Sequence, residues 1–292
     1  MAKSSVLSVE APSGKDAAYE NFPVGSWLLQ STLRSHIVTF YRFARTIDDI
    51  ADNAKLTADE KIKRLEGFEC VLNGKVDKLN VYRTALLMRE SLEKTSISTK
   101  HCLDLVDAFK QDAVKNRYDD WDQLMEYCVR SAAPVGRYLL DLHGGSSKDY
   151  KASDALCSAL QIINHVQDCK DDYLTLDRVY LPQDWMEDEG MEVDGLSSEN
   201  ATPSVRRVIN RTIAATENLM DEAWKLPGTL SSRRLAMESV VILRIAERLI
   251  QRLRKEDPLR SRVQLSRAGY LWLFIRGAIP TAFGVIPSRR PV

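Results

Sequence analysis

Residues 40–53 read "FYRFARTIDDIADN" and carry polar side chains at a regular spacing. Steps of four, three and four residues separate Tyr41, Arg45, Asp48 and Asp52. On a helix, this spacing places all four side chains on one face. One face of an amphipathic helix in a globular protein normally packs on the core. The spacing therefore predicts either a solvated helix surface or a helix that lines a buried polar site.

The composition of the chain bounds what it can be. Its 292 residues could form one large domain or two small ones, and the 44% of apolar residues argues against global disorder. The 41 basic and 41 acidic residues balance, which argues against a bulk nucleic-acid binder and leaves room for local charged patches. Five cysteines without a C-x-x-C pair predict free thiols in a reducing compartment, and four scattered histidines argue against zinc.

Helical periodicity runs through most of the sequence. A capping box, Thr57-x-x-Glu60, predicts a helix that reaches Cys70. Ser153 is expected to cap a long helix over residues 154–173. Further amphipathic helices are expected over residues 81–94, 100–118, 121–133, 205–224 and 233–255. With no alternating strand pattern and no repeat, we predict one all-α domain over residues 19–292, preceded by a flexible tail at residues 1–18.

Two places interrupt this periodicity. Pro134 and Gly136 fall within helical sequence, and a proline there predicts a kink or a break. Residues 184–204 are acidic and aperiodic, which predicts a surface loop or a mobile flap near a site.

The helix expected after Ser153 repeats the polar spacing of the first segment. Steps of three, four and four residues separate Gln161, Asn164, Asp168 and Asp172, among apolar neighbours that predict a largely buried helix. Buried carboxylates without partners are costly, so a cation is expected nearby. Oxygen ligands at this spacing suit Mg²⁺, which takes one or two carboxylates together with phosphate oxygens. If the two faces meet, a Mg²⁺-bridged diphosphate would satisfy both.

Simpler interpretations remain open for several of these residues. Asp-x-x-x-Asp spacings are common on solvated helices. Arg45 could pair with Asp48 or Asp49 on a helix surface. Tyr41 and His165 could be core residues with satisfied polar atoms. The remaining aspartates, Asp49 and Asp171, lie off the two faces and are expected to support the site or to face solvent.

At these residues the sequence resembles the squalene/phytoene synthase family of isoprenyl diphosphate enzymes. The resemblance covers about residues 21–254. It rests on "FYRFARTIDDIAD" and "LQIINHVQDCKDD" as the two aspartate-rich motifs, on "DAVKNRYDDWDQLMEYCVRSAAPVGR" between them, and on "DRVYLP" after the second. It implies an all-α, single-domain isoprenoid synthase helical bundle with a central active-site cavity.

Departures from the general family pattern point to one branch. "ENFPVGS" at residues 20–26 replaces a His-Ser-rich segment, Val129 and Arg130 follow Tyr127-Cys128, and Ser239 stands where a tyrosine is usual. With "SAAPVGR" and "DRVYLP", these features resemble the bacterial hopanoid-pathway branch. That branch implies Mg²⁺-dependent conversion of presqualene diphosphate and water to hydroxysqualene and diphosphate.

The resemblance also implies roles for individual residues. Metal ligands would be Asp48, Asp52, Asn164, Asp168 and Asp172. Arg45 and Arg178 would contact phosphates, and Tyr41 and Gln161 would position the diphosphate or the attacking water, which completes the expected catalytic set. Aromatic candidates for cation stabilisation are Phe22, Phe40, Tyr127 and Tyr138, each of which also suits core packing. Arg130, Ser131 or Gln161 would hold the water.

Two other functions compete with this one. The first is head-to-head condensation of farnesyl diphosphate by an enzyme of the same fold. The second is a non-catalytic binding or assembly protein, which the presence of all four motif aspartates disfavours. No G-x-G-x-x-G segment follows a strand, so nothing indicates a nicotinamide site.

The sequence also gives expectations about where the protein works and what it contacts. No secretory signal is expected, so we predict a cytoplasmic protein that receives its substrate from a presqualene diphosphate synthase. The apolar residues 269–286 could form a final helix over the core or an anchor at the inner face of the membrane.

Overall fold

A computed structural model describes residues 30–75, 81–287 and 289, and the regular structure in these ranges is helical, without a strand. The described residues divide into two compact units, one within residues 1–115 and the other within residues 116–292. The all-α class predicted from the sequence is confirmed. The expected tail at residues 1–18 and the aromatic candidate Phe22 lie outside the described residues.

The first unit contains four described helices: α1 (Arg34–Ala51), α2 (Ala58–Leu72), α3 (Arg83–Thr95) and α4 (Lys100–Asp112). α1 packs against the other three. Its core includes Phe43, whose ring centroid lies 6.1 Å from that of Phe68 on α2. The predicted capping box is present, because Thr57 N–H donates to Glu60 Oε2 at 2.8 Å and Glu60 N–H donates to Thr57 Oγ1 at 3.3 Å.

The second unit contains nine described α-helices and two short 3₁₀ turns. The helices are α5 (Trp121–Ser131), α6 (Ala133–Leu142), α7 (Tyr150–Gln167), α8 (Cys169–Leu176), α9 (Gln183–Asp188), α10 (Pro203–Ala223), α11 (Leu226–Thr229), α12 (Arg233–Leu253) and α13 (Arg267–Ala282). The 3₁₀ turns are η2 (Ser147–Asp149) and η3 (Val193–Ser197).

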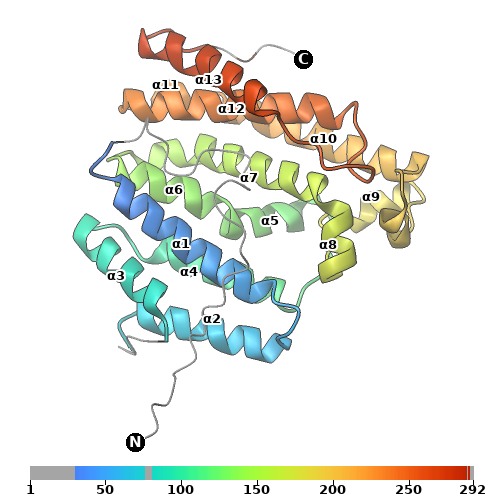
Figure 1. Ribbon diagram of the computed structural model, residues 1–292, viewed down its shortest axis with the longest axis horizontal. Coiled ribbons are helices and arrows are strands. Elements are labelled where there is room, and N and C mark those ends of the chain that lie inside the picture. Colours follow the sequence, from blue (N-terminus) through green and yellow to red (C-terminus); the bar gives the residue numbers. More distant parts are fainter. Residues whose placement is uncertain (1–29, 76–80, 288, 290–292) are drawn as a thin grey trace, which may run out of the picture. The chain divides into compact units, whose positions relative to one another are not determined.

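α7 is the central helix of this unit and packs against α5, α6, α10 and α12 (Figure 1). Gly136 lets α6 approach it closely, because a Cβ there would lie 2.3 Å from Ser153 Oγ and 2.7 Å from Cys157 Sγ. The prediction that Ser153 caps this helix is wrong. α7 begins at Tyr150, and Ser153 is buried within its first turns against Gly136.

Both interruptions of the periodic pattern are visible in the structure. The predicted break is confirmed: α5 ends at Ser131, α6 begins at Ala133, and Pro134 lies in the first turn of α6, where its missing N–H costs nothing. The prediction of an aperiodic loop over residues 184–204 holds only in part. That segment contains α9 and η3, and it is held by buried apolar side chains, among them Trp185, which stacks on Trp121 with a 9° interplanar angle.

The five cysteines are free, as predicted. The C-terminal apolar segment forms α13, which packs on α12. Among the described residues, no helix has both the length and the apolar content needed to cross a membrane.

Candidate active site

The first polar stripe lies on α1 and its C-cap. Asp52 caps the helix and donates its N–H to Asp48 O at 2.9 Å, so the helical register continues through the last stripe residue. Tyr41, Arg45, Asp48 and Asp52 are all half-buried. The neighbouring apolar side chains, Phe40, Phe43, Ile47 and Ile50, are buried. The stripe is therefore the partly accessible side of a helix that is otherwise anchored in its unit.

Arg45 compensates the carboxylates of this stripe. Its Nη1 lies 3.1 Å from Asp48 Oδ2, and its Nε lies 3.3 Å from Asp49 Oδ1. Of the two roles expected for Asp49, the supporting one holds, because its side chain is only 7% exposed and is paired with Arg45. Arg45 thus bridges two acids across one helical turn.

The pKa of Asp48 is raised well above its ordinary value, although 26% of its side-chain surface is accessible. Burial is the main cause, and the Asp52 carboxylate is the next; Arg45 acts in the opposite direction. Asp112, buried at the end of α4, adds to the rise. The sequence analysis missed Asp112, whose only signal was its place at the start of "DAVKNRY". This cluster has more negative charge than one arginine can neutralise, which favours an added cation.

The second stripe lies at the junction of α7 and α8. The prediction of a single long helix here is wrong. α7 ends at Gln167 and α8 begins at Cys169, and Asp168 between them is the C-cap of the first and the N-cap of the second. Asp168 N–H still donates to Asn164 O at 2.9 Å, and Asp172 N–H to Asp168 O at 2.8 Å. The four stripe residues are half-buried, while their neighbours Ile162, Ile163 and Val166 are buried. The polar side is again the accessible side of a buried helix.

Arg262 holds Asp168 in a two-point ion pair. Its Nε lies 2.8 Å from Asp168 Oδ1, and its Nη2 donates to Oδ2 at 3.0 Å. Arg262 belongs to the connection between α12 and α13 and was missed by the sequence analysis. That connection is tied to the same junction by Gln167, which donates to Val263 O, and by Lys170, which donates to Leu259 O at 3.2 Å.

An aromatic cluster surrounds His165 on the inner side of α7. The His165 ring stacks on Tyr180 with a centroid distance of 3.5 Å, and Tyr127 stacks on Tyr180 at 5.8 Å. Burial, followed by the charge of Arg178, lowers the pKa of His165 to about 3, so its imidazole is neutral near pH 7. Its Nε2 lies 3.1 Å from Gln161 Nε2, a stripe residue. The interpretation of His165 as a packed core histidine is confirmed.

The "DRVYLP" segment turns sharply at Asp177. This residue has a left-handed φ of 52°, which aspartate tolerates better than most side chains. Arg117 pairs with Asp177 Oδ1 at 2.6 Å and fixes the turn. The turn buries Arg178, whose backbone N–H donates to Asp172 O at 3.2 Å. The structure therefore brings Arg178 beside both the second stripe and His165.

The residues expected to hold water lie at the break between α5 and α6. Arg130 is half-buried in the last turn of α5. Ser131 is buried, and its Oγ has no hydrogen-bond partner among the described residues. A buried hydroxyl without a partner is unusual in folded proteins and calls for a water or ligand group. Of the aromatic candidates, Phe40, Tyr127 and Tyr138 are core residues, and of the off-stripe aspartates Asp171 faces solvent as expected.

The donor sets of both stripes fit Mg²⁺. Each offers two aspartates one helical turn apart with half-buried side chains, and Mg²⁺ needs only one or two carboxylates together with water and phosphate oxygens. Within the part of the chain that the structure describes, no three His, Cys, Asp or Glu side chains form a complete metal cluster.

Comparison with known proteins agrees with these motifs. The sequence matches the profile of the squalene/phytoene synthase family over residues 16–269. The chain belongs to this family. It is 41% identical over 256 residues to the hydroxysqualene synthase of Rhodopseudomonas palustris, which covers 88% of this chain and 87% of that protein. It is 40% identical over 247 residues to the hydroxysqualene synthase of Sinorhizobium fredii, with coverage of 85% and 84%.

A solved structure extends the comparison to the fold. The crystal structure of a squalene synthase from Alicyclobacillus acidocaldarius matches with a TM-score of 0.70 and 29% identity, covering 81% of this chain and 89% of that chain. The isoprenoid synthase helical fold implied by the sequence is therefore confirmed. The stripes on α1 and on α7–α8 both lie within the residues that match the squalene/phytoene synthase family.

Proposed function

We propose that this enzyme converts presqualene diphosphate and water to hydroxysqualene and diphosphate in squalene and hopanoid biosynthesis. The observation that carries the proposal is 41% identity to a protein named hydroxysqualene synthase over most of both chains. In the reaction, the carbon–oxygen bond to diphosphate breaks and its electron pair leaves with the diphosphate. After rearrangement of the carbocation, a water oxygen forms the new carbon–oxygen bond, and one proton is released.

We propose that Asp48, Asp52, Asn164, Asp168 and Asp172 hold Mg²⁺. When bound, the metal supplies Lewis-acid neutralisation of the leaving diphosphate. Arg45 and Arg178 donate charge-assisted hydrogen bonds to phosphate oxygens. Because Arg45 already pairs with Asp48 and Asp49, it can hold these carboxylates in place before the metal and substrate arrive.

Capture of the cation by water needs one held water and exclusion of the rest. Ser131 suits the holding role, because its Oγ is buried and without a partner in the described structure. Gln161 is the second candidate, since its amide contacts the neutral ring of His165 and is thereby oriented. The Tyr127–Tyr180–His165 cluster offers aromatic faces, each worth about 0.5–2 kcal/mol to a nearby cation.

The proposal also covers the surroundings of the enzyme. The substrate is an apolar diphosphate that another enzyme must make, so we propose hand-over from a presqualene diphosphate synthase. We further propose that the protein works in the cytoplasm with peripheral contact at the inner face of the membrane, where such a substrate resides.

The deciding experiment supplies purified protein with presqualene diphosphate and Mg²⁺ in H₂¹⁸O. We expect hydroxysqualene that carries the label, no effect of NADPH, and no presqualene diphosphate from farnesyl diphosphate alone. Squalene that forms only with NADPH, or efficient condensation of farnesyl diphosphate, would instead assign the head-to-head synthase activity. Absence of diphosphate release from either substrate would leave the non-catalytic alternative.

A further inference from the structure

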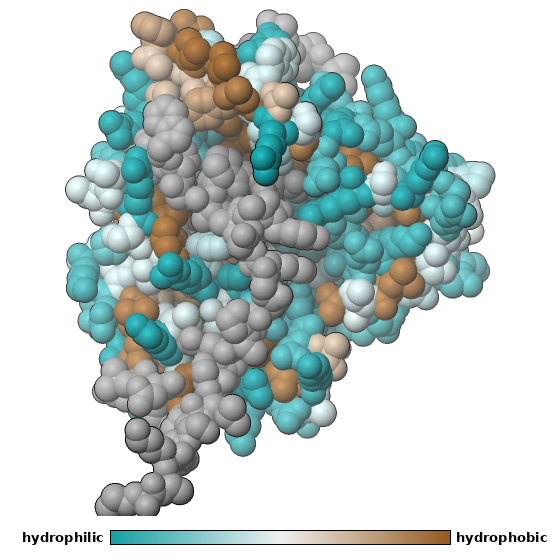
Figure 2. All heavy atoms as spheres, in the orientation of Figure 1, coloured by the Kyte–Doolittle hydropathy of each residue, from teal (hydrophilic) through white to brown (hydrophobic). Residues whose placement is uncertain are grey.

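The outer side of α13 is an unusually apolar surface on the second unit. Helical geometry of 100° per residue places Leu273, Gly277, Ala278 and Thr281 on one side, and these residues are buried. The opposite side exposes what we call the apolar ridge: Leu271, Trp272, Ile275, Ile279 and Phe283. Trp272 is 53% exposed and Phe283 is 84% exposed. Figure 2 shows the resulting hydrophobic patch over α13.

The ridge is not the side by which α13 packs on its own unit. Gly277 provides that contact, because a Cβ there would lie 3.0–3.3 Å from side-chain and backbone atoms of Val241 on α12. The close approach at Gly277 fixes which side of α13 faces α12 and leaves the ridge outward. An exposed apolar stripe of this length marks an interaction surface rather than a scattering of single residues.

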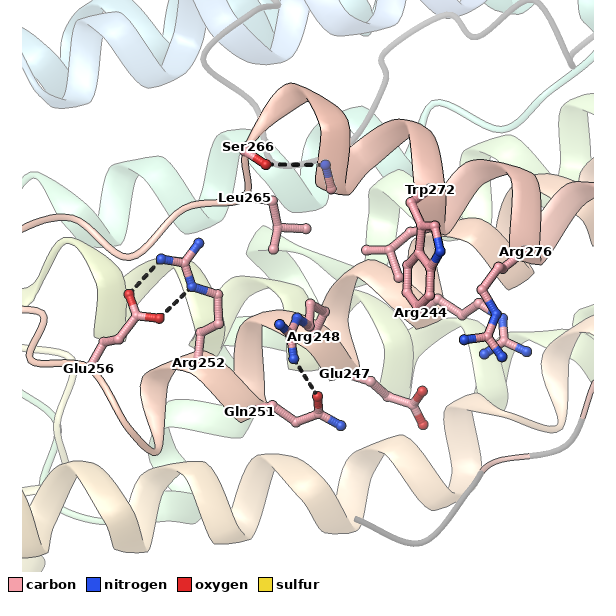
Figure 3. A pocket seen from close by; sticks show the side chains of 12 residues that line it. Arg244, Glu247, Arg248, Gln251, Arg252, Glu256, Leu265, Ser266, Trp272 and Arg276 are labelled. Carbon is pink, nitrogen blue, oxygen red and sulfur yellow. Dashed lines mark hydrogen bonds and ion pairs between the residues drawn. The ribbon is translucent and has the colours of Figure 1, made fainter.

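A row of arginines runs beside the ridge. Arg244, Arg248 and Arg252 follow one another at steps of four on α12, and with Arg276 of α13 they line a cleft of about 800 Å³ between the two helices. Figure 3 shows this arginine row, with Arg244 and Arg276 near one end of the cleft and Arg252 with Glu256 near the other.

Two members of the arginine row, Arg248 and Arg276, make no direct ion pair among the described residues, although the charge of Arg248 also acts on Glu256. Arg252 is neutralised by Glu256, with contacts of 2.5 and 2.6 Å. The other acid in the cleft, Glu247, accepts a hydrogen bond from Trp224 Nε1 at 2.8 Å. Among the described residues, Arg248 hydrogen-bonds only the amide of Gln251, and Arg276 makes no ion pair but lies over the Trp272 ring at 4.6 Å.

The sequence around α13 also carries a net positive charge. From residue 258 to the last residue, the chain contains six arginines and no aspartate or glutamate. The rest of the chain must therefore be net negative, since the whole chain is neutral. Two of these six arginines, Arg262 and Arg289, pair with Asp168 and Asp221, so the excess positive charge of the segment that carries the apolar ridge comes from the other four.

We infer that this face docks on a bilayer that contains anionic phospholipid. The ridge would enter the boundary between headgroups and acyl chains, with Trp272 at the interface, and the arginine row would lie at the level of the phosphates. A second copy of the chain fits less well, because a twofold contact through this face would bring two positive arginine rows together. The inference stands on α13 and α12 alone and does not depend on which isoprenoid reaction the enzyme performs.

The test measures binding of the full chain to vesicles of phosphatidylcholine, with and without phosphatidylglycerol, by co-sedimentation at low and high salt. We expect binding to the anionic vesicles, weaker binding to the neutral ones, and a loss of affinity as salt rises. The double variant Ile275→Gln/Ile279→Gln should weaken binding by about tenfold or more and keep the salt dependence. Arg276→Gln should weaken binding to anionic vesicles by about fivefold and reduce the salt dependence.

Two matched variants control for general effects. Leu87→Gln removes an exposed apolar side chain from α3, and Lys63→Gln removes one exposed positive charge from α2, so both should bind as the parent does. Circular dichroism checks that each variant is folded. Equal binding to neutral and anionic vesicles, no binding to either, or a dimer that the Ile275→Gln/Ile279→Gln variant dissociates would each overturn the inference.

Discussion

At the residue scale, arginine side chains partly neutralise the aspartates of both stripes. Arg45 bridges Asp48 and Asp49, and Arg262 grips Asp168 at two points. Each guanidinium offsets part of the repulsion between aspartates that lie one turn apart. The two arginines do this differently: Arg45 contacts one oxygen each of Asp48 and Asp49, whereas Arg262 contacts both oxygens of Asp168. Arg45 and Arg262 are thus positioning residues for the carboxylates.

His143 gives a residue-scale prediction about pH. It caps the C-terminus of α6, its Nδ1 lies 2.8 Å from Leu139 O, and its buried Nε2 has no partner among the described residues. Burial lowers the pKa of His143 below its ordinary value, because a second N–H would have no acceptor. The neutral form therefore favours the folded state. The stabilisation of the folded state by neutral His143 is complete above the pKa of the unfolded state, about 6.5. It is lost as pH falls from that value toward the lowered pKa of the folded state.

The measurement compares thermal unfolding of the parent and of His143→Asn between pH 8 and pH 5. Asparagine can keep the donor to Leu139 O but does not titrate. The difference in Tm should move in favour of the variant as pH drops below about 6.5. Contributions of other histidines cancel in this difference. A Tm difference that stays constant across the range would contradict the assignment.

At the element scale, two helix breaks lie at residues that we propose for catalysis or metal binding. α5 ends at Ser131, whose hydroxyl has no partner in the described structure, and α7 ends where Asp168 begins the next helix. A continuous helix would keep these side chains at fixed 100° steps. A break frees one residue to turn its side chain and leaves backbone groups available at the ends. The two breaks therefore allow Ser131 and Asp168 to point in directions that a continuous helix would not permit.

Gly136 gives the element-scale prediction, because it sets the distance between α6 and α7. Gly136→Ala would place a Cβ 2.3 Å from Ser153 Oγ and 2.7 Å from Cys157 Sγ. The gain in helix propensity is smaller than the cost of separating two buried helices, so we expect a loss of about 1 kcal/mol or more in unfolding free energy. Urea unfolding followed by tryptophan fluorescence measures this loss, since four of the five tryptophans lie in the second unit.

A double-mutant cycle identifies the cause of that loss. Adding Ser153→Ala removes the nearer of the two atoms and should recover part of the stability lost in Gly136→Ala. Ser153→Ala alone, in the parent background, provides the baseline. Equal losses in the presence and absence of the Ser153 hydroxyl would mean that this contact does not set the distance between the helices.

At the scale of the whole molecule, features that depend on nearby residues could be predicted from the sequence, and contacts between distant residues could not. The capping box at Thr57, the break at Pro134 and both polar stripes depend on residues within one or two helical turns, so the sequence predicted them. Asp112 and Arg262 come from helices and connections far along the chain, and no periodicity links them to the stripes. The break at Asp168 was missed because apolar residues continue helically on both sides of it. The fold class was predictable because it follows from local helical patterns. The partners of each carboxylate were not, because they come from residues distant in the sequence.

The last prediction tests, for each stripe separately, whether its aspartates take part in metal and diphosphate binding. Mg²⁺ and inorganic diphosphate added together should raise the Tm of the parent protein by roughly 5 °C when the complex is at 100 times its Kd, while either one alone should have little effect. Asp48→Asn in the first unit and Asp168→Asn in the second should each remove this shift and abolish turnover, because each loses a charged oxygen ligand. The matched controls Asp59→Asn and Asp171→Asn change exposed aspartates outside the stripes and should keep it. If one stripe variant retains the full shift, the stripe that carries it does not bind the metal and diphosphate, and the assignment of that unit's aspartates as ligands is wrong.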